Sequence, residues 1–350
     1  MRTQTSLNGW LVIDKPPGIT SYDVIRRLKR HLPKALKIGH AGTLDPMATG
    51  VLPVALGQAT RLIEYVHTHP KAYEARWVGG ARTDTDDATG RVIESLSHDE
   101  LRRVLSHYSV SDVRRAFYGM VGVYRQTPPM VSARKVAGKR LYELSRAGTV
   151  IPRDERPVVI YTVHIRHLSL HTDPPTVDFY VRTSKGTYIR TLVQDIGIKL
   201  GLPAHLGYLR RTESGGFTLK HARSLDHVLE RLKEDEGAFR TLLYPLHAPL
   251  QGVRLTVPPS FFSSIQNGRS LLFKMEEASE SIATQDLNIV DRHKERVEAM
   301  RFVEMVDGVM QLQSLVQLFH ENGQLLALYR FVGKQGKALV LRAEKVFPAE

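Results

Sequence analysis

Apolar residues along the chain follow two periods, one typical of strands and one typical of helices. GWLVID, in residues 9–14, is an apolar run of strand length, and KAYEARWVGG, in residues 71–80, alternates apolar and polar positions. Strands are also predicted for VVIYTVHIRHL, in residues 158–168, and TVDFYVRT, in residues 176–183.

Helical spacing marks four further segments. SYDVIRRLKRHL, in residues 21–32, has one apolar face and Ser21 as its expected N-cap, and ATRLIEYV, in residues 59–66, has similar spacing. Ser97 and Glu100 predict a capping box that opens HDELRRVLSHY. A fourth helix is expected over about 187–200. Because strands and helices do not alternate regularly, the order predicts an α+β fold: a mixed, largely antiparallel sheet flanked by helices.

Prolines cluster in PLHAPLQGVRLTVPPS, in residues 245–260, and predict a domain boundary there. Beyond it, LVQLFH, LLALYRFV and ALVLRAEKVF are short strand-like runs separated by glycines, which is typical of a small β-barrel. We therefore expect one domain over residues 1–250 and a second over 251–350. An acidic and polar insertion is expected within the second, at about 274–300.

Charge distinguishes the two predicted domains. The chain of 350 residues carries a formal net charge of +13, yet residues 251–350 hold 12 basic and 12 acidic residues, so the excess lies entirely in residues 1–250. Such an excess favours a polyanionic partner, most often nucleic acid, although it also serves solubility. Cysteine is absent, which excludes disulfides and thiol nucleophiles. No apolar run has the length of a membrane span, so a cytoplasmic protein without membrane contact is expected.

Motifs for common cofactors are missing from the sequence. It contains neither a phosphate-binding GxxxxGK loop nor a GxGxxG dinucleotide turn, and its 15 histidines form no HExxH pair. We therefore expect no metal and no cofactor. Asp84, Asp86 and Asp87 cluster in RTDTDDATG, but their spacing does not match a calcium loop, and a polar hairpin turn is the simpler interpretation.

GHAGTLDPMATGVLP, in residues 39–53, surrounds one carboxylate, Asp45, with three glycines and two prolines. An aspartate before proline is typical of a turn. Small residues on both sides also allow a flat ligand to approach, and no cation lies within four residues of Asp45. A partner for this carboxylate must therefore come from a distant part of the chain.

Seven segments together carry a family resemblance. They are GWLVIDKPPGITSYDV, KIGHAGTLDPMATGVLPVALGQATRL, KAYEA, TDTDDATG, QTPPMVSARKVAGKRLYELSRAG, TSKGTYIRTL and LGYLRRTESGGF. In this order and spacing the chain resembles the bacterial TruB family of tRNA pseudouridine-55 synthases, from about Gly9 to Phe217. The region after residue 250 resembles, more loosely, the small RNA-binding PUA barrel that ends these proteins.

The resemblance assigns roles to individual residues. Asp45 corresponds to the catalytic aspartate, Arg190 to the arginine that pairs with it, and Tyr73 to an active-site tyrosine that stacks on the target base. His40 resembles the histidine inserted among the RNA loop bases, Asp87 an aspartate that hydrogen-bonds near the flipped nucleotides, and Leu209 an apolar wall of the site. Further RNA-binding residues are expected in TSKGTYIRT and in a gripping loop over about 124–156: Lys185, Tyr188, Arg134, Lys135, Lys139 and Arg140.

The implied reaction is isomerisation of a T-loop uridine in tRNA by base flipping, without metal, redox cofactor or second substrate. Asp45 would attack the sugar C1′, take a proton from C2′ to give a glycal, or attack uracil C6, and the sequence does not choose among these. The resemblance also implies a protein that needs neither guide RNA nor protein partner, expected to be a monomer. An RNA chaperone without chemistry and a paired-carboxylate glycosidase are the alternatives; no second acid occurs in a comparable motif.

Overall fold

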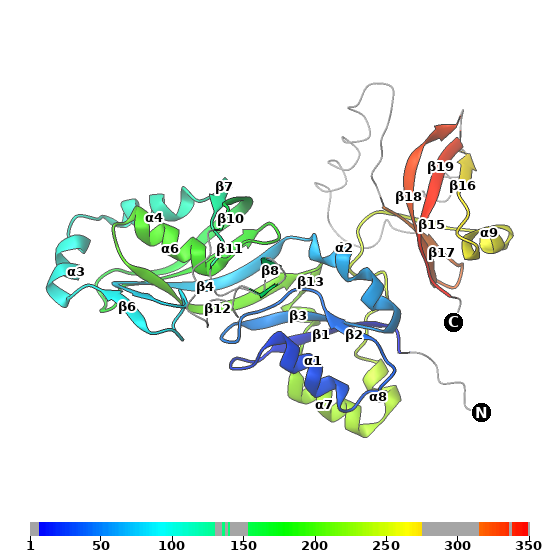
Figure 1. Cartoon of the computed structure of the whole chain (residues 1–350), viewed down its shortest axis with the longest axis horizontal. Helices are drawn as coiled ribbons and strands as arrows, with labels where there is room; N and C mark the ends of the chain where they lie inside the picture. The colour runs from blue at the N-terminus through cyan, green and yellow to red at the C-terminus, as the bar shows by residue number, and fades with distance from the viewer. Residues whose placement is uncertain are drawn as a thin grey trace. The chain divides into compact units, whose positions relative to one another are not determined.

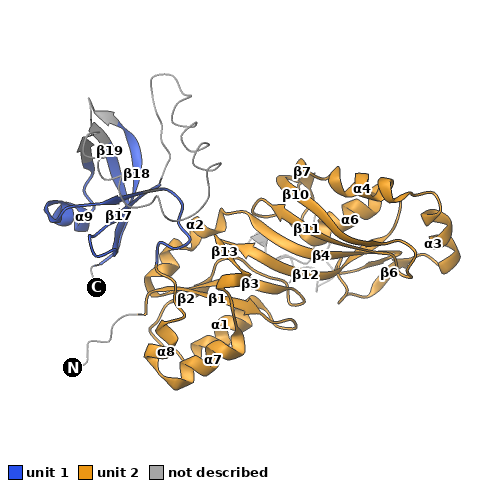
Figure 2. Cartoon of the chain, turned by 180° about the vertical axis from the view of Figure 1, so that it is seen from behind, with its two compact units in different colours: residues 1–6, 246–350 blue, residues 7–245 orange. Residues whose placement is uncertain are grey.

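The computed structural model describes residues 7–129, 135–136, 139–140, 153–274, 315–335 and 338–348. The chain divides into two compact units, one spanning Leu7–Pro245 and the other beginning at Leu246 (Figure 2). The domain boundary predicted after residue 250 lies a few residues beyond this division. The roles assigned to the two domains remain predictions.

The larger unit is built on a ten-stranded sheet (Figure 1). Its strands are β1 (Gly9–Lys15), β2 (Ile38–His40), β3 (Thr49–Leu56), β4 (Lys71–Gly79), β7 (Gly122–Gln126), β10 (Arg156–Ser169), β11 (Thr176–Thr183), β12 (Ala204–Ser214), β13 (Phe217–Thr218) and β14 (Arg223–Ser224). They lie in the order β14-β1-β3-β12-β4-β11-β10-β7, with β2 beside β3 and β13 beside β12. Only the pairs β1/β14 and β3/β12 are parallel among these contacts. The expected mixed, largely antiparallel sheet is confirmed.

Short helices surround this sheet, and two small ribbons extend from it. The helices are α1 (Ser21–Lys29), η1 (Gly57–Leu62), α2 (Ile63–His67), α3 (His98–Leu105), α4 (Val110–Tyr118), α6 (Ile189–Lys199), η2 (Leu219–His221), α7 (Leu225–Glu234) and α8 (Glu236–Arg240). The ribbons are β5 (Ala81–Thr83) with β6 (Val92–Ser95), and β8 (Lys135–Val136) with β9 (Lys139–Arg140). Helix α6 packs on β12, α4 on β10, and α7 on β1. In the described ranges no helix combines the length and apolar character needed to cross a membrane.

Helix ends correct two details of the sequence prediction. Thr20, not Ser21, is the N-cap of α1, because its hydroxyl accepts from the Asp23 backbone N–H while Asp23 bonds back to Thr20. The predicted helix over 59–66 is instead a 3₁₀ turn followed by the five-residue α2. The capping box of Ser97 and Glu100 is confirmed at the start of α3.

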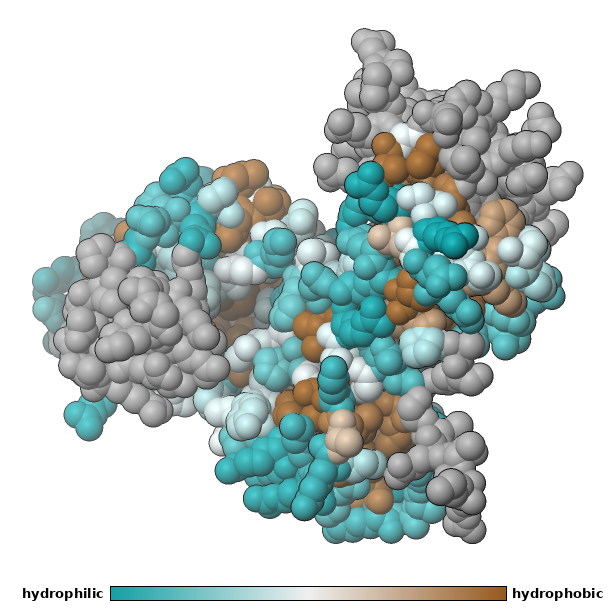
Figure 3. Space-filling model, turned by 45° about the vertical axis from the view of Figure 1, so that its right-hand side comes forward, coloured by the Kyte–Doolittle hydropathy of each residue, from teal (hydrophilic) through white to brown (hydrophobic). Residues whose placement is uncertain are grey.

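The core of the larger unit lies between the sheet and its helices. Trp77 of β4, Phe117 of α4 and Phe179 of β11 meet edge to face, with ring centroids 6.4 Å and 5.2 Å apart, and all three side chains are buried. Because these apolar side chains are buried in the core, they do not contribute to the surface, and hydrophilic residues (teal) cover much of the face seen in Figure 3.

The second unit has its own five-stranded sheet and its own apolar core. The strands β15 (Val253–Thr256), β16 (Leu271–Lys274), β17 (Leu315–Phe319), β18 (Leu325–Gln335) and β19 (Ala338–Val346) follow the order β15-β17-β18-β19-β16, with η3 (Pro259–Phe261) and α9 (Phe262–Gln266) beside them. This small β-unit agrees with the predicted PUA-like fold. Apart from Lys274, the expected insertion at about 274–300 lies outside the described residues.

Candidate active site

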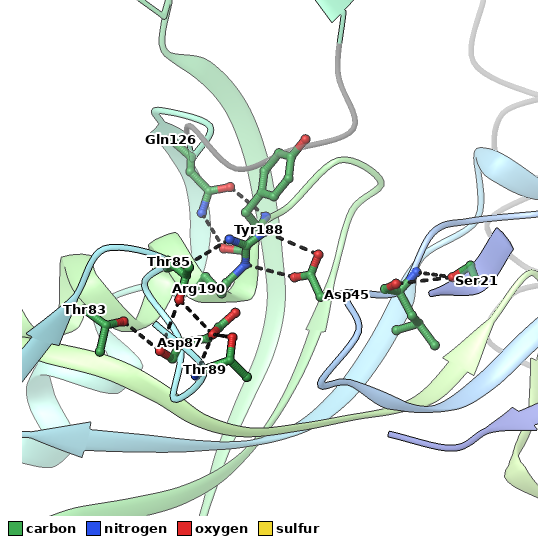
Figure 4. Close-up of polar contacts among 10 residues, drawn as sticks. Ser21, Asp45, Thr83, Thr85, Asp87, Thr89, Gln126, Tyr188 and Arg190 are labelled. Carbon is green, nitrogen blue, oxygen red and sulfur yellow. Dashed lines mark hydrogen bonds and ion pairs between the residues drawn. The ribbon is translucent and has the colours of Figure 1, made fainter. Parts of the chain in front are cut away.

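Asp45 lies in the turn between β2 and β3, and buried groups hold the backbone of that turn. The Ser21 hydroxyl accepts from the Leu44 N–H at 2.8 Å and donates to the Leu44 carbonyl at 3.2 Å (Figure 4). The Pro46 carbonyl accepts from the Gly18 N–H at 2.9 Å and from the Lys15 ammonium at 3.1 Å. Side chains and backbone from the β1–α1 segment therefore fix both neighbours of Asp45.

Arg190, in the first turn of α6, supplies the distant cation that the sequence required. Its Nε donates to Asp45 Oδ2 at 2.9 Å and its Nη2 to Oδ1 at 3.3 Å, while Nη1 donates to the Thr85 carbonyl at 2.9 Å. Figure 4 shows the guanidinium between the carboxylate and the Thr85 loop. Only 4% of the Arg190 side chain is exposed, against 35% of the Asp45 side chain. The arginine is therefore locked by three hydrogen bonds, whereas one side of the carboxylate stays accessible.

Tyr73 on β4 lies opposite Arg211 on β12 in the sheet register, and both side chains are buried. Burial raises the pKa of the Tyr73 phenol, and the nearby Asp45 carboxylate raises it further, while Arg211 opposes both effects by charge and by a hydrogen bond. Tyr73 is thus a phenol at neutral pH whose proton is influenced by two charged neighbours. The sequence assigned no such neighbour to Tyr73.

Arg211 is the main residue whose role the sequence did not predict. It is 1% exposed and donates to the carbonyls of Val51 at 2.8 Å, Thr43 at 3.2 Å and Gly42 at 3.0 Å. Gly50 is required beside it, because a Cβ at Gly50 would lie 2.1 Å from the Arg211 carbonyl oxygen. Arg211 therefore braces both ends of the turn that carries Asp45. The sequence signal that could have indicated a buried Arg211 is the segment YLRRTES, which is long enough for a strand and forms part of β12.

The hairpin between β5 and β6 presents the Thr85 carbonyl to Arg190. Asp87, 5% exposed, shapes this loop: its Oδ1 accepts from the Thr85 hydroxyl at 2.9 Å, from the Thr89 N–H at 2.9 Å and from the Thr89 hydroxyl at 2.6 Å. The polar hairpin expected for this segment is therefore present. Its Asp87 holds the loop that supports Arg190, and its expected contact with nucleotides stays a prediction.

Tyr188 is the N-cap residue of α6, two residues before Arg190. The buried Gln126 side chain binds its backbone on both sides: Oε1 accepts from the Tyr188 N–H at 2.8 Å and Nε2 donates to the Tyr188 carbonyl at 3.0 Å (Figure 4). This amide pair fixes the start of α6, and with it the position from which Arg190 reaches Asp45.

The remaining predicted residues are distributed around this centre. His40 ends β2, half-buried, and burial together with the charges of Arg211 and His67 lowers the pKa of its imidazole. Leu209 on β12 is buried, and Lys185 is exposed between β11 and α6. Arg134 lies outside the described residues, and for Lys135, Lys139 and Arg140 only the backbone of the β8–β9 ribbon is described. Among the side chains that are described, no three His, Asp or Glu residues are grouped as metal ligands.

Comparison with known proteins agrees with this geometry. Residues 29–189 match the family model described as TruB family pseudouridylate synthase, N-terminal domain, and residues 190–251 match the one described as tRNA pseudouridylate synthase B C-terminal domain. A protein of Streptococcus sanguinis named tRNA pseudouridine synthase B is 39% identical over 78% of this chain and 90% of its own. One of the same name from Lactobacillus acidophilus is 36% identical over 84% of this chain and 94% of its own.

Solved structures support the fold. A chain in the crystal structure of a Cbf5-Nop10-Gar1 complex superimposes with a TM-score of 0.61 at 24% identity, covering 97% of this chain and 84% of that one. A chain in a structure of an H/ACA RNP bound to a substrate RNA containing 2′-deoxyuridine gives the same TM-score at 22% identity, covering 97% of this chain and 85% of that one. From the matched family models, the identity to full-length relatives and the shared fold, the chain belongs to the TruB family of pseudouridylate synthases.

Proposed function

We propose that this protein is a tRNA pseudouridine synthase that isomerises a uridine in the T-loop of tRNA. The observation that carries the proposal is the pair of Asp45 and Arg190: an accessible aspartate held in a fixed orientation by a buried, bidentate arginine. The family of the chain, and relatives named tRNA pseudouridine synthase B, support the reaction and the substrate.

The chemistry balances within one nucleotide. The N1–C1′ bond breaks, the uracil turns while bound, and the C5–C1′ bond forms; C5 loses its proton and N1 ends with one, so no oxidant or second substrate is consumed. Asp45 would begin the reaction as a nucleophile at C1′, as a base at C2′ or as a nucleophile at uracil C6. All three roles need an ionised carboxylate at a fixed angle, which two donors from Arg190 provide.

The neighbours of Asp45 suit a flipped base. Tyr73 and Leu209 would contact the uracil, and Tyr73, a phenol at neutral pH, would hold a proton near it. His40 would enter the space that the base leaves. Because its pKa is lowered, His40 is a neutral ring at pH 7, and stacking by such a ring offsets part of an extrusion cost of a few kcal/mol.

Further RNA contacts are proposed for Asp87, Tyr188, Lys185, Arg134, Lys135, Lys139 and Arg140. The positive excess of residues 1–250 supports such a footprint on phosphates. We also propose that the protein acts as a monomer on tRNA, without a guide RNA or protein partner, and in the cytoplasm, where its substrate is found.

The test uses the purified full-length protein alone with an unmodified tRNA transcript. Pseudouridine is mapped by carbodiimide modification and reverse transcription, and we expect one stop in the T-loop. Asp45→Asn is the matched control: it should lower the rate by at least about 10³-fold while tRNA affinity changes by no more than about threefold, because many cations provide affinity. A wild-type protein that binds tRNA but leaves the T-loop unmodified would favour the chaperone alternative.

A further inference from the structure

Three cationic side chains from separate segments lie beside the turn that carries Asp45. This cationic cluster consists of Lys71 of β4, Lys185 before α6 and Arg211 of β12, with His67 of α2 at its edge. Two of them meet at Gly42: a Cβ added there would lie 3.5 Å from Nη1 of Arg211 and 3.6 Å from Cε of Lys71. Gly42 leaves room for both, so the backbone and the cations approach closely.

The cluster has buried charge without a matching carboxylate. Lys71 is 9% exposed and Arg211 1%, and buried cations in proteins are normally paired with anions. Within the ranges that the structure describes, neither forms an ion pair; Lys71 Nζ instead donates to the carbonyls of His67 at 3.3 Å and His69 at 3.1 Å. Asp45, the carboxylate that interacts with Arg211, is already bound by Arg190.

The members of the cluster also repel one another. Burial lowers the pKa of Lys71 to about 8, and the charges of Arg211 and Lys185 contribute to the lowering. Burial and the charges of Lys71, Arg211 and Lys185 lower the pKa of His67 in the same way. An anion bound at this position would relieve the repulsion, which is the physical signature of a site built for a negative ligand.

We propose that the cationic cluster binds one phosphate of the RNA backbone next to the flipped uridine. The inference rests on the proposed function. The exposed Lys185 and His67 would donate directly to the phosphate oxygens, while the buried Lys71 and Arg211 supply positive potential behind them. The position suits this ligand, because Lys71 lies two residues before Tyr73 on β4 and Arg211 bonds the Asp45 turn. A phosphate held here would fix the sugar whose C1′ must meet Asp45.

A thermodynamic cycle between protein and RNA tests the site. The protein is wild type or Lys185→Gln, and the ligand is a T-stem-loop RNA whose phosphates near the target uridine are replaced, one at a time, by neutral methylphosphonate. For wild type we expect about a tenfold loss of affinity at one linkage. Lys185→Gln should bind the natural RNA several-fold more weakly than wild type does. Replacing the same phosphate should then lower the affinity of this variant only slightly further. The slope of log affinity against log salt concentration should also be smaller by about 0.7.

Lys233→Gln is the matched control, an exposed lysine on α7 away from the cluster. It should retain the full loss at the same linkage. Equal losses for wild type and Lys185→Gln at every linkage would overturn the phosphate site. That outcome is distinct from failure of the proposed function, which would be absence of pseudouridine in wild-type reactions, because the cycle measures binding alone.

Discussion

Arg190→Lys tests whether the fork of the guanidinium, rather than its charge, positions Asp45. Arg190 uses three nitrogens, two on the carboxylate and one on the Thr85 carbonyl. A lysine keeps the charge but has one ammonium at the end of a flexible stem, so it cannot reproduce the two parallel donors and the third contact together. About two of these hydrogen bonds would be lost. Hydrogen bonds to charged groups are worth about 1.5–3 kcal/mol each, and the lower value applies because 35% of the Asp45 side chain is exposed to solvent. The predicted loss in the free energy of unfolding is therefore about 3 kcal/mol.

The catalytic effect should be larger than the effect on binding. Misplacing a catalytic group by about 1 Å can lower the rate about 10²-fold, and a carboxylate that is free to rotate is misplaced by such a distance. We expect that loss in single-turnover release of tritium from tRNA labelled at uridine C5, with tRNA affinity within about threefold of wild type. Arg76→Lys is the control, because Arg76 binds Asp178 through two bonds of 2.6 and 2.8 Å but is 49% exposed, and it should cost less than about 1 kcal/mol. A turnover rate for Arg190→Lys within threefold of wild type would refute the positioning role.

Three further predictions concern residues in and around the turn that carries Asp45. Ser21→Ala leaves the Leu44 N–H and carbonyl without their buried partner and should lower the free energy of unfolding by about 1–3 kcal/mol, measured by urea denaturation. Gly50→Ala should lower the free energy of unfolding by more than about 3 kcal/mol, because the new Cβ would lie 2.1 Å from the Arg211 carbonyl oxygen. Gly186 also has a positive φ but has open space around it, so Gly186→Ala should lower the free energy of unfolding by only about 1 kcal/mol. Equal losses for the two variants would contradict the steric explanation. Lys71 has a pKa of about 8 when folded and 10.5 as its reference value, so the unfolded chain binds more protons between these values and stability should rise with pH there. The gain between pH 8 and pH 10 should be about 2 kcal/mol, and Lys71→Met should lack it in denaturation measured at these two pH values.

The sequence predicted the strands with clear periodicity and missed those without it. GWLVID and TVDFYVRT have apolar or alternating patterns and became β1 and β11. AHLGYLRRTES became β12, in the middle of the sheet, although it carries three charged residues. Its charges find partners only in the tertiary structure: Arg210 with Asp14, and Arg211 with backbone carbonyls. Periodicity in one segment cannot reveal such compensation, because the partners of Arg210 and Arg211 lie 160 or more residues away in the sequence.

The same limit applies to the site. Asp45 stood out because small residues and prolines surround it, and its pairing with Arg190 was implied by the family resemblance alone. Ser21 is expected to cap the helix, since a serine before an amphipathic run normally indicates that task, and no role is predicted for Arg211. In the structure Thr20 caps the helix, which leaves the Ser21 hydroxyl for Leu44. Local sequence patterns therefore predict that a hydroxyl residue caps this helix, but only the tertiary structure determines that Thr20 is the cap and that Ser21 binds Leu44.

Under the proposed function, the backbone of the turn and the carboxylate of Asp45 are held by separate groups. Ser21, Lys15 and Arg211 bind backbone groups of the turn, at Leu44, Pro46, Gly42 and Thr43. Once the backbone is fixed, only the side-chain torsions of Asp45 remain free, and Arg190 restrains those. The aspartate is thus oriented before RNA arrives. Binding energy from the basic surface would then be available for extruding the base, which costs a few kcal/mol, rather than for ordering Asp45.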